Sequence, residues 1–279
     1  MSKYELLPQQ LLHEGTLDPT DLFQPEDVSE EVITRTHDLT YWEKLKVGGL
    51  SPSEIRRTGF PYSEQLIRRE VNIMSGTLAA TAFALEDGVA LNIAGGTHHA
   101  FVDRGEGFCL LNDQAIASNY LLDNEMAASI LIIDLDVHQG NGTAQIFEDE
   151  PAVFTFSMHG AKNYPLEKES SDWDIPLPDG TGDGEYLDHL DDALVTLFSR
   201  LQPDFVFYQC GVDVLANDRL GRLNLSLQGC RERDKKVLNA CRAHGVPLVA
   251  CMGGGYSPTL AEIVEAHANT FRLAREIFD

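Results

Sequence analysis

The sequence has no run of about eighteen apolar residues, the length that a membrane-spanning helix needs, and residues 1–10 are too polar for a secretory signal. Cysteine is also scarce: the five cysteines form no CxxC pair, and their odd number argues against a disulfide framework. Cys210 and Cys251 lie in apolar runs and are predicted to be buried thiols. We therefore expect a soluble, cytoplasmic protein that does not associate with membranes.

Basic residues are few, with 21 Lys and Arg against 44 Asp and Glu, which gives a formal net charge of −23. This balance argues against direct nucleic-acid binding, because phosphates are bound by a basic face. An acidic surface of this kind suits a cationic substrate, although a solvated surface with no ligand has the same composition.

The composition supports a sizeable core, since 43% of the 279 residues are hydrophobic. No internal repeat, low-complexity tract or long linker divides the chain, so we predict one domain over residues 1–279. The sequence contains no signature of an oligomeric state, and a core of this size is compatible with a monomer.

Short apolar runs alternate with longer helical patterns along the chain. Nearly continuous apolar strands are typical of a sheet covered on both faces, and strand–helix alternation indicates parallel strands. The sequence therefore predicts an α/β three-layer sandwich, with a mostly parallel central sheet flanked by helices. Residues 160–182 are predicted to be rich in loops, and residues 14–63 to form helices and loops at the mouth of the site. The predicted strands are 89–94, 129–136, 152–157, 204–210 and 246–252, and the predicted helices are 64–85, 112–124, 184–201, 227–243 and 258–277.

Polar side chains follow these strands, and in parallel sheets ligands bind beyond the carboxyl ends of the strands. Gly95-Gly96-Thr97-His98-His99 follows the first run, and Asp134-Leu135-Asp136-Val137-His138 closes the second. Three later strands are followed by Ser157, Asp213 and Tyr256. Five strand ends are therefore predicted to deliver polar groups to one edge of the sheet.

The second of these segments has the pattern of a metal site. Side chains alternate along a strand, so Asp134, Asp136 and His138 are predicted to point to the same face. A catalytic zinc site needs three protein ligands and one open position for water. Asp136 and His138 can supply two ligands, and Asp213, preceded by the conformationally permissive Gly211, can supply the third.

Seven stretches of the chain, in this order, resemble the zinc-dependent histone deacetylases, which have the arginase/deacetylase fold. The likeness extends over about residues 60–260, and the segment Gln139-Gly140-Asn141-Gly142 is most similar to the class IV branch and its bacterial relatives. The stretches are GGTHHAF (95–101), GEGFCLLND (105–113), DLDVHQGNGT (134–143), FSMH (156–159), PLPDGTGDGEYL (176–187), CGVDVLANDRLGRL (210–223) and MGGGYS (252–257).

The resemblance implies one Zn²⁺ per chain and a catalytic pair of histidines. His99 would take a proton from the attacking water and then protonate the leaving amine, with Asn141 behind its ring. His98 would orient the water and stabilise charge, with Asp134 hydrogen-bonded behind it. Tyr256 would donate a hydrogen bond to the acyl carbonyl. The zinc ligands would be Asp136, His138 and Asp213.

The resemblance also implies a passage for an extended acyl-lysine side chain, lined by Gly107 and Phe108, with Gly254 leaving room for the acyl group. A structural K⁺ would be held behind the zinc by Asp134, Ser157 and Met158. The expected activity is the removal of acetyl or longer acyl groups from lysine amines of proteins. Acetylpolyamines and other small amides are the alternative substrates.

Three features depart from the family pattern. Asn141 stands where many relatives have an aspartate, so His99 is expected to be less basic than in those relatives. The chain starts at Met1 with its first helical pattern, whereas the family opens with a strand and a His-Pro loop; we expect either that the chain is truncated or that this strand is absent, and in both cases a more open site. No residue matches the rim aspartate that grips the substrate backbone in histone-directed members.

Two other functions are compatible with the pattern. An arginase-type ureohydrolase would need two Mn²⁺ ions and an acid where this chain has Gly140, so one metal is favoured. A catalytically inactive module that binds acyl-lysine or a polyamine would share the ligand set, and only a turnover assay would separate it from an enzyme. His159 has no assigned role. The remaining histidines are expected on the surface or in helices: His13, His37, His189, His244 and His267.

Overall fold

The computed structural model describes residues 2–279 and has a six-stranded sheet in the order β1-β6-β5-β2-β3-β4. Every pair of neighbouring strands in it is parallel, so the predicted mostly parallel sheet is confirmed. The strands are β1 (Val89–Asn92), β2 (Ile130–Asp134), β3 (Val153–Gly160), β4 (Trp173–Leu177), β5 (Phe205–Gln209) and β6 (Leu248–Cys251).

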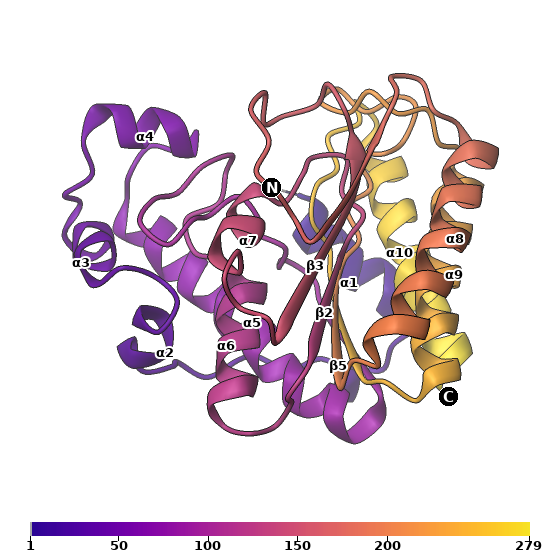
Figure 1. Ribbon diagram of the computed structural model, residues 1–279, viewed down its shortest axis with the longest axis horizontal. Helices are drawn as coiled ribbons and strands as arrows, with labels where there is room; N and C mark the ends of the chain where they lie inside the picture. The colour runs from indigo at the N-terminus through magenta and orange to yellow at the C-terminus, as the bar shows by residue number, and fades with distance from the viewer. Residues whose placement is uncertain (1) are drawn as a thin grey trace.

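Helices cover both faces of the sheet, which makes three layers (Figure 1). Along β2, the side chains of Ile130 and Ile132 join a core cluster with α5 and α6, while Leu131 and Ile133 join another with α8 and α9. This alternation explains why the strands are apolar at consecutive positions. The first group of helices is α5 (Glu64–Asp87), α6 (Asp113–Asp123) and α7 (Asn141–Ile146), and the second is α8 (Asp183–Leu201), α9 (Leu227–His244) and α10 (Leu260–Phe278).

Helix α9 has clear end signals in its sequence. The side chain of Ser226 accepts a hydrogen bond from the backbone N–H of Gly229, and the helix ends at Gly245, whose φ of 65° lies in the left-handed region. All five predicted helices are confirmed within three residues at either end. The amino-terminal helix α1 (Lys3–His13) packs against α10 through Leu7 and Leu11.

The segment before α5 forms short helices with a small core of their own, on one side of the sandwich (Figure 1). This agrees with the prediction of helices and loops over residues 14–63. The elements are η1 (Pro19–Asp21), α2 (Glu30–Thr34), α3 (Leu39–Val47) and α4 (Pro52–Thr58).

Residues 160–182 are rich in loops as predicted, but the stretch also contains a strand that was not predicted, β4. It is an edge strand that pairs only with β3, four of its five residues are not buried, and it contains Pro176. An edge strand of this kind carries no continuous apolar run, so hydrophobic periodicity does not reveal it.

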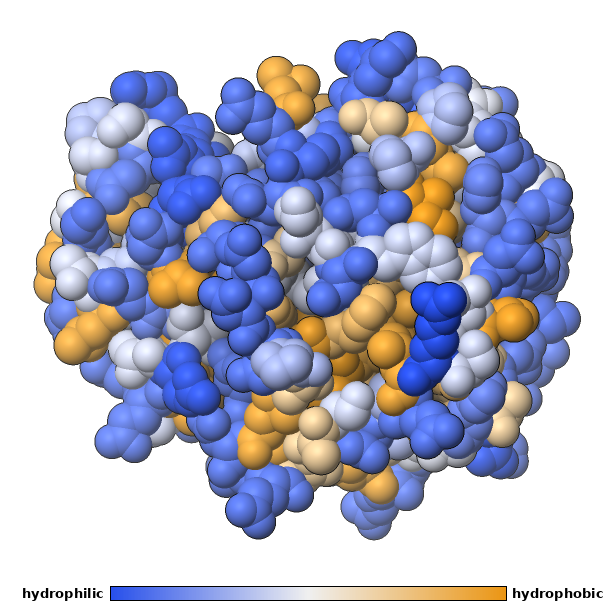
Figure 2. All heavy atoms as spheres, viewed as in Figure 1, coloured by the Kyte–Doolittle hydropathy of each residue, from blue (hydrophilic) through white to orange (hydrophobic). Residues whose placement is uncertain are grey.

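The face drawn in Figure 2 is mostly hydrophilic, with a hydrophobic area near its lower centre. Within residues 2–279, none of the helices combines the length and the apolar character that crossing a membrane requires.

Candidate active site

The loop after β2 is built by aspartates that bond to backbone amides two residues further on. A carboxylate oxygen of Asp134 accepts the N–H of Asp136 at 3.1 Å, and one of Asp136 accepts the N–H of His138 at 3.0 Å. These turns end the strand at Asp134, because such side-chain bonds replace those of a ladder. The prediction that all three side chains share one face of a strand was therefore wrong, since Asp136 and His138 lie in the loop.

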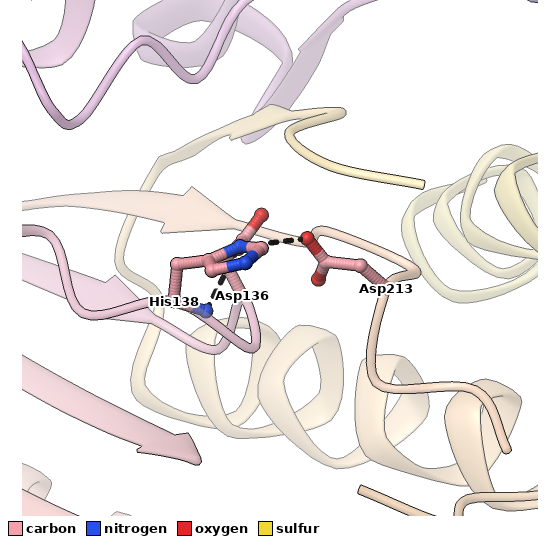
Figure 3. Close-up of side chains that lie close together, drawn as sticks. All are labelled: Asp136, His138 and Asp213. Carbon is pink, nitrogen blue, oxygen red and sulfur yellow. Dashed lines mark hydrogen bonds and ion pairs between the residues drawn. The ribbon is translucent and has the colours of Figure 1, made fainter. Parts of the chain in front are cut away.

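Asp136, His138 and Asp213 nevertheless converge (Figure 3). Nδ1 of His138 lies 3.0 Å from Oδ1 of Asp136 and 3.1 Å from Oδ2 of Asp213, and one candidate ligand atom from each residue lies within 4.8 Å of the others. Asp213 follows β5, the neighbour of β2, and its other oxygen accepts the N–H of Val137 at 3.0 Å. We call these three residues the metal-ligand cluster.

The metal-ligand cluster suits a divalent cation. Two buried carboxylates face one imidazole, and burial together with the Asp136 carboxylate raises the pKa of Asp213 to about 6. A single N–H of His138 can point at only one oxygen, and Oδ2 of Asp213 has no hydrogen-bond donor among residues 2–279. Two oxygen ligands and one nitrogen ligand are a set that zinc accepts in catalytic sites.

Two glycines make space for the metal-ligand cluster. A Cβ atom on Gly211 would lie 2.1 Å from a carboxylate oxygen of Asp136, and one on Gly254 would lie 1.9 Å from Oδ2 of Asp213. The N–H of Gly254 also donates to Asp136 at 2.8 Å. Gly254, predicted to leave room for an acyl group, thus lies directly against the ligand carboxylates.

His98 and His99 lie side by side at the end of the glycine turn, with ring centroids 4.1 Å apart. Nδ1 of His98 is 2.7 Å from Asp134, and Nδ1 of His99 is 2.7 Å from Oδ1 of Asn141. Both pairings follow the prediction. The His99 ring centroid lies 5.9 Å from that of His138, which brings the histidine pair next to the metal-ligand cluster.

The turn that presents the two histidines is fixed by the buried Asp113. Its carboxylate accepts the backbone N–H groups of Gly96 and Thr97 and the Thr97 hydroxyl, all at 3.1 Å or less. The side chain of Gln209, the last residue of β5, donates to the carbonyl of Gly96 at 3.0 Å. Backbone groups of a buried turn need such partners, and here side chains supply them.

The two histidines differ in charge because their partners differ. Burial lowers the pKa of His98, but the Asp134 carboxylate outweighs it and raises that pKa to about 9. Burial, with nearby His98 and His138, holds the pKa of His99 well below its usual 6.5, and the neutral amide of Asn141 compensates little. At neutral pH, His98 is therefore cationic and His99 neutral.

Tyr256 follows β6 on a loop tied to the rest of the site. Its backbone N–H donates to Asp218 at 2.6 Å, and the N–H of Gly253 donates to the carbonyl of Gly95 at 3.1 Å. The ammonium of Lys3 donates to the carbonyl of Gly253 at 3.3 Å and lies 5.6 Å from the Tyr256 ring centroid. Burial raises the pKa of Tyr256 well above 10, so its hydroxyl remains a donor.

Three aromatic side chains lie around the site through contacts with His99, with Tyr256 or with each other, and we call Phe60, Phe108 and Tyr164 the aromatic rim. The Phe108 ring packs on Phe60 at 5.2 Å between centroids and lies 6.5 Å from Tyr256. Tyr164 meets His99 edge-on at 5.0 Å, and its hydroxyl donates to Glu106. Phe108 is 44% exposed and Tyr164 is 38% exposed.

Gly107 and Phe108 both have a left-handed backbone, with φ of 51° and 68°. A Cβ on Gly107 would lie 2.6 Å from the His99 ring, so a glycine is required where this loop passes the histidine. The N–H groups of both residues donate to carbonyls of Arg57 and Thr58 in α4, which places residues 57–60 at the site as predicted.

A comparison with known protein families shows to which family the chain belongs. The family model described as "Histone deacetylase domain" matches residues 1–271. The chain belongs to the histone deacetylase family.

Individual relatives agree with this assignment. An uncharacterized protein of Picosynechococcus is 42% identical over 278 residues, covering 100% of this chain and 93% of the relative. Histone deacetylase 2 of Arabidopsis thaliana is 31% identical, over 94% of this chain and 70% of the relative. The crystal structure of a histone deacetylase homologue from Aquifex aeolicus superposes with a TM-score of 0.83 at 25% identity, over 98% of this chain and 77% of that one.

Family membership confirms the predicted fold and the prediction of a hydrolase that acts on acetylated amides.

Several residues at the site were not predicted from the sequence. Asp218 lies within the matching stretch 210–223, so an acid five residues after Asp213 could have been noticed. Tyr164 lies in a segment for which only a loop-rich character was predicted. Lys3 lies in a helix that is far along the sequence from the other residues of the site.

The buried His37 was also misjudged. Its Nδ1 bonds to the carbonyl of Phe101 and its Nε2 accepts the N–H of Asn112, both at 2.9 Å.

Ser157 and Met158 lie in β3 beside β2, where Ser157 pairs with Asp134 in the sheet register and its hydroxyl contacts His159 at 3.0 Å.

Proposed function

We propose that this chain is a zinc-dependent deacylase that removes acetyl or longer acyl groups from lysine side-chain amines of proteins. The observation that carries the proposal is the buried metal-ligand cluster next to two adjacent histidines, one bonded to a carboxylate and the other to a neutral amide. Zinc bound by Asp136, His138 and Asp213 would act as a Lewis acid on the acyl carbonyl and would acidify the attacking water.

The residues around the ligands supply the proton transfers. His99, neutral and held by Asn141, accepts a proton from the attacking water and delivers it to the leaving amine. His98, cationic beside Asp134, orients the water and stabilises negative charge in the transition state. Tyr256, whose hydroxyl stays protonated, donates to the developing oxyanion.

The aromatic rim favours a substrate with an apolar stem. Tyr164 and Gly107 lie next to His99, and the Phe108 ring lies 6.5 Å from the Tyr256 ring, so aromatic faces are available to pack along a lysine side chain. The net charge of −23 favours cationic substrates, both lysine-rich proteins and acylated polyamines, and disfavours nucleic acids. Gly254 lacks a side chain where one would meet the Asp213 carboxylate, and we assign it to the part of the site that receives the acyl group.

Two further parts belong to the proposal. We assign residues 1–279 to a single catalytic domain, supported by one continuous sheet. We also assign a structural K⁺ to the region behind Asp134, with Ser157 and Met158 as the adjoining residues; the register of β2 and β3 supports this by pairing Asp134 with Ser157.

The test is hydrolysis of lysine peptides carrying acetyl, octanoyl and myristoyl groups, beside acetylated polyamines, with zinc content measured on the same sample. The His99→Ala variant, purified identically, controls for contaminating hydrolases. Turnover of an acyl-lysine peptide with about one zinc per chain supports the proposal. Turnover of acetylated polyamines alone would replace the protein substrate with a small amide. Bound zinc without any turnover would leave a binding module, and two metals per chain would indicate the arginase-type chemistry.

A further inference from the structure

Arg233, a cation on α9, has one of the largest fully buried side chains within residues 2–279. It makes five polar contacts within 3.2 Å, one for each of its N–H donors. Two go to the carboxylate of Asp234, from Nε at 2.8 Å and from Nη2 at 2.7 Å. The other three go to backbone carbonyls: Leu135 at 3.1 Å and Gly211 at 2.6 Å from Nη1, and Cys210 at 3.2 Å from Nη2.

These three carbonyls belong to the two loops that carry the metal-ligand cluster. Leu135 directly precedes Asp136, and Cys210 and Gly211 begin the loop that reaches Asp213. The loops follow two neighbouring parallel strands, β2 and β5, whose paired residues end at Asp134 and Gln209. Arg233 therefore bridges the backbone of both loops where the sheet no longer joins them.

The charge of Arg233 is balanced within the core. Oδ1 of Asp234 also accepts the Tyr208 hydroxyl at 2.6 Å, and Oδ2 accepts the Thr270 hydroxyl at 2.6 Å. Replacing a satisfied buried ion pair with apolar side chains of similar volume is often neutral or stabilising, so such a pair is weak evidence for a role in stability. The three backbone contacts are what an apolar replacement would lose.

We propose that Arg233 is a positioning residue that sets the separation of the two ligand-bearing loops and thereby the affinity and geometry of the metal site. The inference rests on the proposed zinc site. A planar guanidinium has donors in a fixed fork, so it can hold carbonyls of two loops at a defined spacing, whereas a lysine ammonium is a single point. Groups that orient metal ligands without touching the metal typically change metal affinity about 10- to 100-fold when removed.

The test compares an apolar network with the natural one. In the fourfold variant, Arg233→Met, Asp234→Leu, Tyr208→Phe and Thr270→Val remove the ion pair and both hydroxyls together, so no buried polar side chain loses its partner. The three backbone carbonyls lose their donors, so we expect the metal-free protein to fold with lower thermal stability than the parent, and zinc affinity to be about 10- to 100-fold weaker in competition with a chromogenic chelator. The visible absorption bands of the Co²⁺-substituted protein should also shift, because they report ligand geometry.

Two further variants separate position from stability. Arg233→Lys keeps the buried charge but not the fork, so we expect weaker zinc binding and a shifted Co²⁺ spectrum in this variant too. Leu197 lies in α8 and belongs to the hydrophobic core cluster that also contains Tyr208. Leu197→Ala should lower stability while leaving zinc affinity and the Co²⁺ spectrum unchanged below the unfolding transition.

Parent-like zinc affinity and an unaltered Co²⁺ spectrum in either folded Arg233 variant would overturn the inference and leave the deacylase proposal intact. Equal losses of zinc affinity in Leu197→Ala and the Arg233 variants would also overturn it, since stability alone would then explain them. If the parent protein takes up neither zinc nor Co²⁺, the deacylase proposal fails, and the role of Arg233 fails with it.

Discussion

The metal-ligand cluster and the aromatic rim lie next to each other but are held in different ways. Asp136, His138 and Asp213 are 1%, 8% and 0% exposed, and backbone N–H groups bond to both carboxylates. Phe108 and Tyr164 are 44% and 38% exposed and rest mainly on ring contacts. The cluster is fixed before a substrate arrives, while rim side chains can change rotamer on binding. Changes in the cluster should therefore act on metal and turnover, and changes in the rim on substrate affinity.

The largest effect is expected for Asp213→Ala. The variant loses a ligand and leaves Asp136 without its carboxylate neighbour, so bound zinc should fall to background. Turnover should drop by about 10³-fold or more, because the Lewis acid is worth several kcal/mol to the transition state. Metal analysis and an acyl-lysine assay on one sample measure both. Asp191→Ala, a surface carboxylate paired with Lys236, is the matched control and should change neither. Full zinc occupancy in Asp213→Ala would remove this residue from the ligand set.

His99→Ala should separate metal binding from turnover. It removes the neutral imidazole that accepts a proton but no metal ligand, so zinc content should stay at the parent value while kcat falls about 10²- to 10⁴-fold. His189→Ala, an exposed histidine of α8, controls for the loss of any histidine. Parent-like turnover in His99→Ala would assign the base to another group, and loss of zinc would extend the metal-ligand cluster to the histidine pair.

A change in the aromatic rim should mainly raise KM. Phe108→Ala removes a ring that packs on Phe60, and we expect KM for an acyl-lysine peptide to rise about 10-fold with little change in kcat, as for the loss of one apolar contact in a pocket. Phe83→Ala provides a control, since Phe83 is 42% exposed and pairs with Phe23 away from the site. A fall in kcat with unchanged KM would show that the rim takes part in the chemistry and would break the contrast drawn above.

The smallest effect concerns His37, which joins the loop that carries Phe108 to the start of α6. Burial lowers its pKa to about 4, so between pH 6.5 and 4 the unfolded chain binds a proton that the folded chain does not. Stability is therefore lost as the pH falls, by about 2 kcal/mol between pH 7 and 5. Thermal unfolding at both pH values should show a smaller decline for His37→Gln than for the parent. Equal declines would mean that the protonation of His37 is not coupled to unfolding.

Much of the fold could be predicted because the central strands are apolar at consecutive positions, as in Ser129-Ile130-Leu131-Ile132-Ile133. The edge strand β4 could not, because it is half exposed and interrupted by Pro176. The positions of Asp136, His138 and Asp213 followed from the rule that parallel strands present their carboxyl ends together. The end of β2 could not be predicted, because the Asp134 side chain bonds to the backbone and ends the strand earlier than periodicity indicates.

Lys3 and Tyr164 show what sequence patterns do not contain. Lys3 reaches the Tyr256 loop from a helix 250 residues away along the chain, and Tyr164 reaches His99 from an irregular loop. Neither residue lies in one of the stretches that suggest chemistry, Lys3 being part of a helical pattern and Tyr164 of a loop-rich segment. Only the packing of α1 and of the loop after β3 brings them to the site.

The register of β2 and β5 has a consequence for the order in which the chain acquires its structure. Val137 and Asp213 are joined by a hydrogen bond across 76 residues, and the intervening segment holds α7, β3, β4, α8 and β5. The loop-closure entropy of so distant a contact must be offset before the pairing contributes any stability, so parallel strands of this kind form slowly. The third ligand position therefore becomes complete late in folding. A metal ion that needs all three ligands would slow unfolding rather than speed folding, and metal-free chains would be lost to degradation faster than loaded ones.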